Sequence, residues 1–204
     1  MRLLFVCTGN MCRSAAADRL MHAFAEGSAL PLEIRSAGTH ARHGRSIHPQ
    51  TAAALERHRI DSSAFRSRRL SAEDVEWADL VLTMTTEHRE EVVGVSPRGL
   101  RKVFTLIEAA ALGAGLPAGG SNSSDPRARG AQLVDALTEA RALRRALPRD
   151  YDIVDPIDGP AELHMQVVAE VAAAVRVLID VLDVPAMGEQ TNRMNCLPPV
   201  PPRR

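Results

Sequence analysis

Near the start of the chain, five residues separate a cysteine from an arginine, in the segment Cys7-Thr8-Gly9-Asn10-Met11-Cys12-Arg13-Ser14. The apolar run 2–6 before it predicts a short buried strand, and periodic apolar positions after Ser14 predict a helix. A loop between a strand and a helix directs backbone N–H groups and the positive end of the helix toward one point, which forms an anion site. Gly9 and Asn10 both tolerate positive φ, which we expect of a loop that wraps around an oxyanion.

The residue types in this loop predict nucleophilic chemistry on a phosphate group. Amide dipoles and a neighbouring guanidinium favour the thiolate form of Cys7, which is the nucleophilic form of cysteine. Arg13 is placed to bind two phosphate oxygens at once, and Ser14 to donate a hydrogen bond to the sulfur. The alternative, a small buried cysteine of the core, requires no arginine on the same loop.

Alternating strand and helix patterns predict a parallel sheet with helices on both faces. Strands are expected at Arg2–Val6, Leu32–Ser36, Asp79–Met84 and Lys102–Leu106, and helices at 14–27, 48–59, 85–92, 107–112, 131–147 and 163–182. The segment 113–130 is rich in Gly, Ser, Asn and Pro and predicts a loop. The Pro-rich segment 185–204 predicts a disordered tail. We therefore expect one domain over 1–184, with an inserted loop and helix at about 113–147.

Composition limits the classes of function. The chain has 204 residues, with 25 Lys and Arg against 25 Asp and Glu, so its formal net charge is zero. Overall charge thus gives no support to binding of nucleic acid or of a membrane surface. Three cysteines form no disulfide framework, and the apolar run at 3–6 is too short for a signal peptide. A reducing, cytoplasmic setting is expected.

The loop segment resembles the signature of low-molecular-weight protein tyrosine phosphatases, and the resemblance covers most of Met1 to Asp183. Four further segments resemble the family. Ser36-Ala37-Gly38-Thr39 follows the second strand, and Gly44 to Pro49 precedes the next helix. Arg68 and Leu70 lie ahead of the third strand region, Trp77 to Met84, and Asp155-Pro156 precedes the last helix.

The resemblance implies a fold and a mechanism. The fold is a four-stranded parallel sheet flanked by helices on both faces, a phosphatase I-like three-layer sandwich. The resemblance implies that Cys7 attacks phosphorus and forms a cysteinyl-phosphate, and that Asp155 protonates the leaving oxygen and then activates water. It also implies that Asn10 holds the loop in shape through Ser36, with Ser14 as further support. The phosphate-binding residues are then Thr8, Gly9, Asn10, Met11, Cys12, Arg13 and Ser14.

The residues themselves also make Asp155 credible as an acid. It follows the apolar pair Ile153-Val154 and precedes a stiff turn near a helix start. Any single aspartate there could instead cap the helix or shape the turn. Asp150, Asp152 and Asp158 are nearby rivals, and the Asp-Pro match to the family distinguishes Asp155 from them.

Departures from the family pattern concern the substrate more than the chemistry. Ala15 replaces the proline that usually follows the signature serine, and Phe65 stands where the family often has a histidine that braces the asparagine. The loop His40-Ala41-Arg42-His43 and the pair Ile157-Asp158 lack the aromatic residues that members favouring phosphotyrosine often carry. Tyr151 is a possible substitute. Related bacterial enzymes act on phosphoarginine, and some have threonine at the position of Met11.

The sequence therefore predicts a phosphomonoesterase, first of all a protein tyrosine phosphatase. Alternatives are a phosphatase of phosphoarginine or of a small phosphate ester, a phosphate-binding module without turnover, and an arsenate reductase. The last needs further cysteines, and none lies between Cys12 and Cys196. Cys12 either forms a reversible disulfide with Cys7 or packs beneath the loop. No cofactor, metal, nucleic acid or membrane is expected, and the expected partner is a phosphorylated protein or small phosphate ester.

Overall fold

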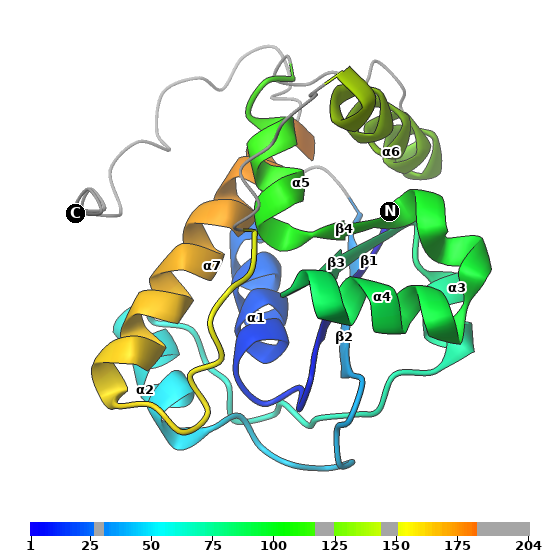
Figure 1. Cartoon of the computed structure of the whole chain (residues 1–204). Helices are drawn as coiled ribbons and strands as arrows, with labels where there is room; N and C mark the ends of the chain where they lie inside the picture. The colour runs from blue at the N-terminus through cyan, green and yellow to red at the C-terminus, as the bar shows by residue number, and fades with distance from the viewer. Residues whose placement is uncertain (27–30, 117–124, 144–150, 183–204) are drawn as a thin grey trace, which may run out of the picture.

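Four parallel strands form a single sheet in the order β2-β1-β3-β4 (Figure 1). The structure, a computed structural model, describes residues 1–26, 31–116, 125–143 and 151–182. This arrangement confirms the predicted four-stranded parallel sheet, and each predicted strand is present with small shifts at its ends. The strands are β1 Arg2–Cys7, β2 Glu33–Gly38, β3 Leu80–Thr83 and β4 Val103–Thr105.

Helices cover both faces of the sheet, as predicted. Side chains of successive β1 residues alternate between the faces, so Leu3 and Phe5 join one core cluster while Leu4 and Val6 join the other. The first cluster is covered by α1 Arg13–Ala25, α2 Pro49–Arg57, α5 Leu106–Gly113, α6 Pro126–Leu143 and α7 Ala161–Leu182. The second is covered by α3 Ala72–Trp77 and α4 Thr86–Val95, which the 3-10 helix η1 Pro97–Lys102 follows.

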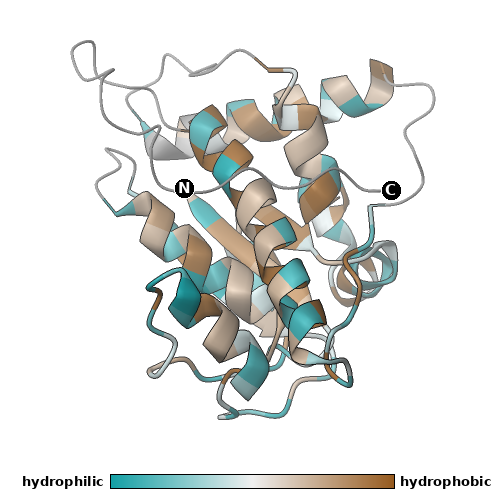
Figure 2. Ribbon diagram, turned by 90° about the vertical axis from the view of Figure 1, so that its left-hand side faces the viewer, coloured by the Kyte–Doolittle hydropathy of each residue, from teal (hydrophilic) through white to brown (hydrophobic). Residues whose placement is uncertain are grey.

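Burial of the strands explains why they read as unbroken apolar runs. Leu3, Leu4, Phe5 and Val6 are all fully buried, as expected for a parallel sheet with helices on both sides. Burial of each such side chain contributes about 1.5–3 kcal/mol. In Figure 2 the surrounding helices carry both hydrophobic and hydrophilic residues along their length.

The long C-terminal helix follows its predicted pattern. The five residues of the predicted apolar stripe of α7 are all buried, against α1, α2 and α5. The first turn of α7 follows directly on the segment that contains Asp155. The stripe therefore fixes the position of that segment relative to the sheet. Its members are Val167, Val171, Val175, Leu178 and Leu182.

Two α-helices differ from the sequence prediction, and the 3-10 helix η1 was not predicted. Helix α3 was not predicted; it begins with a capping box in which the Ser71 hydroxyl accepts the Asp74 N–H and the Asp74 carboxylate accepts the Ser71 N–H. Helix α6 begins at Pro126, inside the segment 113–130 that was predicted as a loop. Proline suits the first helical turn because its φ is already helical. The predicted end of that helix at 147 and the predicted tail 185–204 lie outside the described residues.

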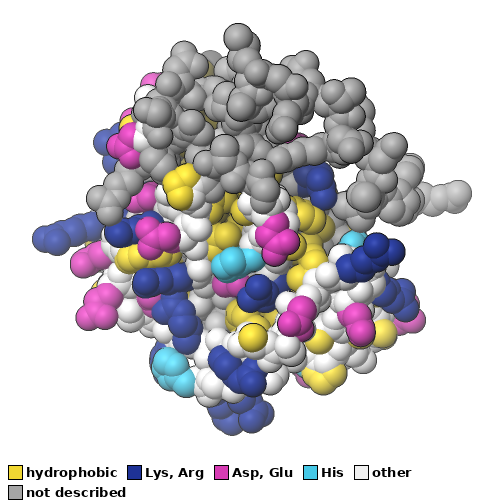
Figure 3. Space-filling model, turned by 180° about the vertical axis from the view of Figure 1, so that it is seen from behind, with side chains coloured by type: hydrophobic (Ala, Val, Ile, Leu, Met, Phe, Trp, Pro, Cys, Tyr) yellow, Lys and Arg dark blue, Asp and Glu magenta, His cyan; other side chains and the backbone are white. Residues whose placement is uncertain are grey.

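Acidic and basic side chains both occur on the described part of the face that is turned away in Figure 1. Basic and acidic side chains are interspersed on its left and right sides, and basic ones gather at its lower edge (Figure 3). Such mixing agrees with the equal numbers of acidic and basic residues. Within the described ranges, no helix combines the length and the apolar character that crossing a membrane requires.

Candidate active site

The loop between β1 and α1 lies at the carboxyl edge of the sheet, where ligands of open parallel sheets usually bind. Cys7 ends β1 and is buried. The Asn10 N–H points at its sulfur with N···S 3.3 Å, and the Ser14 hydroxyl lies 2.9 Å from the same atom. Both groups are donors that stabilise a negative sulfur. The structure thus brings Cys7 and Ser14 together as predicted.

Asn10 carries the conformational strain of the loop. Its φ is +53°, and its side-chain amide donates to the Ser14 hydroxyl at 2.9 Å while its carbonyl oxygen accepts the Arg68 N–H at 3.0 Å. Two predictions are corrected here. Gly9 is not among the described residues with positive φ, because Asn10 makes the turn. Among the described residues, Ser36 makes no hydrogen bond to Asn10; the Asn10 carbonyl oxygen accepts instead from the backbone of Arg68.

Gly38 lets the second strand approach the loop closely. The β1–β2 register pairs it with Cys7. A Cβ atom at position 38 would lie 2.4 Å from the Thr8 carbonyl oxygen and 2.9 Å from the Asn10 nitrogen. Both atoms belong to the loop backbone, which cannot move aside as a flexible side chain would. Gly38 is therefore a requirement of the loop that the sequence analysis did not identify.

We expect Gly38→Ala to impair both activity and stability. Displacing the loop backbone by a fraction of an ångström to 1 Å should lower kcat by about 100-fold, and the crowding should destabilise the fold by about 1–3 kcal/mol. Phosphatase kinetics and urea unfolding measure the two effects. Gly94→Ala is the matched control, because a Cβ at position 94, inside α4, meets no atom within 4 Å. Equal behaviour of the two variants would contradict the steric argument.

Arg13 lies at the first position of α1 and is buried. Its Nη1 donates to the Ile153 carbonyl at 3.0 Å, and its Nη2 lies 3.4 Å from the Thr8 hydroxyl and 2.5 Å from Asp155 Oδ2. Its Nε is buried and makes no hydrogen bond to any described residue. The guanidinium is therefore fixed in place and keeps a donor for an anion in the loop.

Asp155 reaches the loop although it is 142 residues from Arg13 in the chain. The Ile153 N–H donates to the Met84 carbonyl at 2.9 Å, which ties the segment to the end of β3. The Asp152 carboxylate accepts the Thr86 N–H at 2.7 Å. Of the predicted rivals, Asp152 therefore has a structural role, and Asp150 lies outside the described residues. Asp155 is the described carboxylate that contacts Arg13, and its side chain is 40% exposed, so solvent and a substrate can reach it.

His88 supports the loop from the opposite side. Its Nε2 lies 2.8 Å from the Thr8 hydroxyl and its Nδ1 2.6 Å from the hydroxyl of Thr85, the N-cap of α4. Burial, and next the positive charge of Arg13, lower the pKa of His88 from 6.5 to about 4. A neutral ring can accept from the Thr8 hydroxyl, which in turn accepts from Arg13. His88 thus helps to orient Arg13, a role that no sequence motif indicated.

We expect His88 to make the fold less stable in acid. Its folded-state pKa is below its ordinary value, so the unfolded chain binds the proton first as the pH falls. Its contribution is fully present above about pH 6.5 and is lost as the pH falls toward 4, by on the order of 3 kcal/mol. Urea unfolding between these pH values should show a smaller loss for His88→Gln than for the wild type. His43→Gln, at an exposed position, should follow the wild type; a wild-type slope in His88→Gln would refute the assignment.

Cys12 differs from Cys7 in its surroundings. Both are free thiols in the structure. Burial raises the pKa of Cys12 to about 11, although a hydrogen bond with Thr51 opposes this effect. Cys12 is therefore a neutral thiol near neutral pH, which leaves Cys7 as the nucleophile of the loop. Packing beneath the loop, one of the two predicted roles of Cys12, agrees with its burial, and the disulfide stays a prediction.

Exposed side chains lie on the segments on either side of the loop. Val154 and Ile157 flank Asp155 and are 61% and 39% exposed. His40 is exposed and lies 3.8 Å from the Glu91 carboxylate. His40 and Ile157 stand at the positions where the usual aromatic residues are missing, whereas Val154 lines an apolar pocket with residues of α5 and α7.

Comparisons with known proteins agree with this geometry. Residues 2–112 match the family model of the low molecular weight phosphotyrosine protein phosphatases. A protein-arginine-phosphatase of Geobacillus stearothermophilus is 40% identical over 106 residues, which cover 52% of this chain and 68% of that protein. The low molecular weight protein-tyrosine-phosphatase Etp of Escherichia coli K12 is 35% identical over 107 residues, or 50% of this chain and 68% of that protein.

A solved structure extends the similarity over most of the chain. It is a cysteine-to-serine mutant of the YwlE arginine phosphatase with a phosphorylated active-site serine. It is 29% identical, has a TM-score of 0.65, and covers 87% of this chain and 93% of its own. The match of more than half of the chain to the family model, together with this shared fold, identifies a hydrolase. The chain belongs to the low-molecular-weight phosphotyrosine protein phosphatase family.

Proposed function

We propose that this enzyme hydrolyses phosphorylated protein side chains through a cysteinyl-phosphate intermediate. The observation that carries the proposal is the contact of the Arg13 guanidinium with Asp155 at 2.5 Å, at the end of the loop that begins with the buried Cys7. A nucleophile, an anion-binding cation and an acid then surround one position, as phosphoryl transfer requires.

In the first step the Cys7 thiolate attacks phosphorus, and the bond between phosphorus and the leaving oxygen breaks. Asp155 gives its proton to that oxygen. Arg13 and the loop amides from Thr8 to Ser14 bind the other phosphoryl oxygens and stabilise the charge of the transition state. The free Nε donor of Arg13 supports this role. Arg13 also has to give up its contact with Asp155, at least in part, so that the acid can approach the leaving group.

In the second step water attacks phosphorus from the side that the leaving group has vacated. The Asp155 carboxylate now takes a proton from that water, and the bond between sulfur and phosphorus breaks. The thiolate that leaves is stabilised by the Ser14 hydroxyl at 2.9 Å and the Asn10 N–H at 3.3 Å. Inorganic phosphate is released, and the enzyme returns to its starting state.

Phosphotyrosine is the first proposed substrate, because the chain belongs to a phosphotyrosine phosphatase family. Phosphoarginine is the second candidate, for two reasons. A relative at 40% identity is a protein-arginine-phosphatase, and Ile157, which follows Asp155-Pro156, is aliphatic and offers a phenyl ring no aromatic stacking. For a phosphoarginine, the same acid would protonate nitrogen in place of oxygen.

The setting that we propose follows from the nucleophile. A free, reactive thiol persists in a reducing compartment, so we propose the cytoplasm, with a phosphorylated protein as the partner. We also propose that 1–184 forms one catalytic domain and that 185–204 is a tail. The consecutive packing of elements from β1 to α7 supports the single domain.

The experiment that tests the proposal has two parts. Hydrolysis of p-nitrophenyl phosphate at mildly acidic pH measures phosphatase activity without regard to substrate class. Release of inorganic phosphate from two otherwise identical peptides, one with phosphotyrosine and one with phosphoarginine, then measures the ratio of kcat/KM. A higher value for phosphotyrosine supports the first candidate, and a higher value for phosphoarginine the second. Absence of turnover on all three compounds would refute the proposed function.

A further inference from the structure

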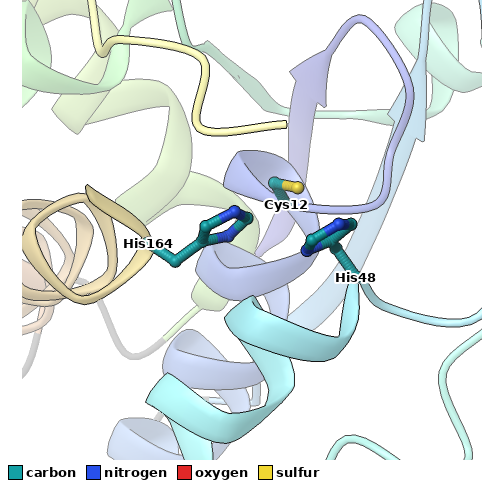
Figure 4. A group of neighbouring side chains, drawn as sticks. All are labelled: Cys12, His48 and His164. Carbon is teal, nitrogen blue, oxygen red and sulfur yellow. The ribbon is translucent and has the colours of Figure 1, made fainter. Parts of the chain in front are cut away.

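Three potential metal ligands lie together on the inner side of the phosphate loop. They are Cys12 at the N-cap of α1, His48 at the N-cap of α2 and His164 in the first turn of α7. One ligand atom from each lies within 4.8 Å of the others. In Figure 4 the two imidazole rings face each other and the sulfur of Cys12 lies beside them. The residues are far apart in the sequence, so no metal motif was recognisable there.

The two histidines keep nitrogen atoms that the protein does not satisfy. His164 is completely buried, and its Nδ1 lies 2.7 Å from the Thr51 hydroxyl. Its Nε2 is buried and meets no described group in full hydrogen-bond geometry, although the Pro156 carbonyl interacts with the ring, and Nδ1 of His48 is likewise buried without a partner among the described residues. A buried polar atom without a partner costs about 1–3 kcal/mol. Two such atoms beside a thiol therefore indicate a ligand that would accept their lone pairs.

Thr51 occupies the position of a supporting residue. Histidines that bind metals usually donate their other ring N–H to a neighbouring oxygen, which fixes the tautomer and the direction of the ring. With the His164 Nδ1–H donated to Thr51, the Nε2 lone pair is directed away from Thr51 and is free to bind. Thr51 is itself buried, so this orientation does not depend on solvent.

We propose that Cys12, His48 and His164 form a binding site for a borderline-soft divalent metal ion of the zinc type. One thiolate and two imidazoles are the donors that such ions prefer, and water would complete a tetrahedral shell. The ion replaces the proton of the Cys12 thiol, which passes to solvent, and no atom is oxidised or reduced. The site is separate from the chemistry assigned to Cys7, Arg13 and Asp155.

Metal binding requires the three ligand atoms to move closer together and one imidazole ring to turn. Ligand atoms around tetrahedral zinc are roughly 3.3–3.6 Å apart, given the usual bond lengths, so atoms that now lie within 4.8 Å of one another must close in by up to about 1.5 Å. The rings are stacked at 11° with centroids 4.6 Å apart, and two parallel rings cannot direct their in-plane lone pairs at one ion. His48, which is half-buried, is the ring with room to turn.

A bound ion would join three segments that form the active site. Cys12 belongs to the phosphate loop, the His48 N–H donates to the Met11 carbonyl at 2.9 Å, and His164 follows the segment of Asp155. Since the unfolded chain does not hold these residues together, binding stabilises the fold, by about 2.7 kcal/mol when the free ion is at 100 times its Kd. The site therefore links metal supply to the stability of the enzyme.

Cobalt(II) titration of the metal-free full chain tests the site. Cobalt(II) is the probe because tetrahedral thiolate coordination gives it strong visible absorption and a thiolate charge-transfer band. The parent for the experiment is Cys196→Ser, which removes a thiol outside the described residues. We expect saturable absorption that zinc displaces. Cys12→Ser should abolish the charge-transfer band, and His48→Gln and His164→Gln should each weaken binding by about 10-fold or more.

Two further variants make the result specific. Cys7→Ser should retain the band, since its thiol is not a ligand of this site, and His43→Gln should bind as the parent does. Zinc should raise the melting temperature of the parent and not that of Cys12→Ser. The proposal is overturned if no band forms, or if the band persists in Cys12→Ser and is lost in Cys7→Ser. Circular dichroism verifies that the variants fold. If the buried His164→Gln variant does not fold, His48→Gln, at a half-buried position, tests the histidine ligands in its place.

Discussion

Cys7→Ser should lose its turnover of p-nitrophenyl phosphate almost completely, with kcat lower by about 10⁶-fold. The hydroxyl of serine is not ionised at neutral pH, so the loop amides and Arg13 would surround a neutral and weak nucleophile. The fold should be unaffected, because the neighbours at 3.3 Å and 2.9 Å, the Asn10 N–H and the Ser14 hydroxyl, can bond to an oxygen as well. Steady-state kinetics together with urea unfolding separate these two effects.

A matched control comes from the cysteine at the other end of the chain. Cys196→Ser also removes a thiol, from outside the described residues and outside the signature loop, and we expect it to turn over as the wild type does. A serine that does accept the phosphoryl group should release it slowly, since an alkoxide is a poorer leaving group than a thiolate. A stable phosphoserine adduct, detected by mass spectrometry, would therefore agree with the mechanism. Wild-type turnover in Cys7→Ser would disprove it.

Asp155→Asn should lower kcat by about 100- to 10,000-fold, without an increase in KM. Asparagine has nearly the same shape but cannot give a proton to the leaving oxygen. The substitution also removes the charge attraction between residue 155 and Arg13. In the wild type, Arg13 Nη2 lies 2.5 Å from Asp155 Oδ2. Because the guanidinium is then free for phosphate, substrate binding should be as strong as before or stronger. Measurement of kcat and KM separately distinguishes lost proton transfer from lost binding.

The leaving group provides a sharper test of the same residue. The p-nitrophenolate ion needs little protonation, whereas phenolate needs more, so the loss in Asp155→Asn should be larger with phenyl phosphate than with p-nitrophenyl phosphate. Asp158→Asn, three positions further on, is the control and should show no such dependence. An equal loss on both substrates would indicate that Asp155 only holds Arg13 in position.

Several features of the protein were determined by residues that are close together in the sequence. The apolar run of β1, the loop and the start of α1 are contiguous, so the contacts of Cys7 with Asn10 and Ser14 span at most seven residues. Local preferences and hydrogen bonds decide such a turn, and the sequence predicted it together with the alternation of strands and helices. Helix α3 was missed because six residues give too short a periodic pattern, and its signal is the capping box of Ser71.

Which distant groups meet at the loop was decided by tertiary structure. The Arg68 N–H reaches Asn10 from 58 residues away and His88 reaches Thr8 from 80 residues away. Arg68 was noted only as part of the family resemblance, without this contact, and His88 carries no motif. The sequence placed Asp155 as an acid through a family resemblance, whereas its contact with Arg13 depends on the Ile153–Met84 hydrogen bond and on the packing of α7. Likewise Cys12, His48 and His164 became neighbours because three helices begin at one edge of the sheet. Burial of the apolar helix faces fixes the distances between these helix ends. The order of residues in the sequence does not specify those distances, so the cluster could not be predicted from it.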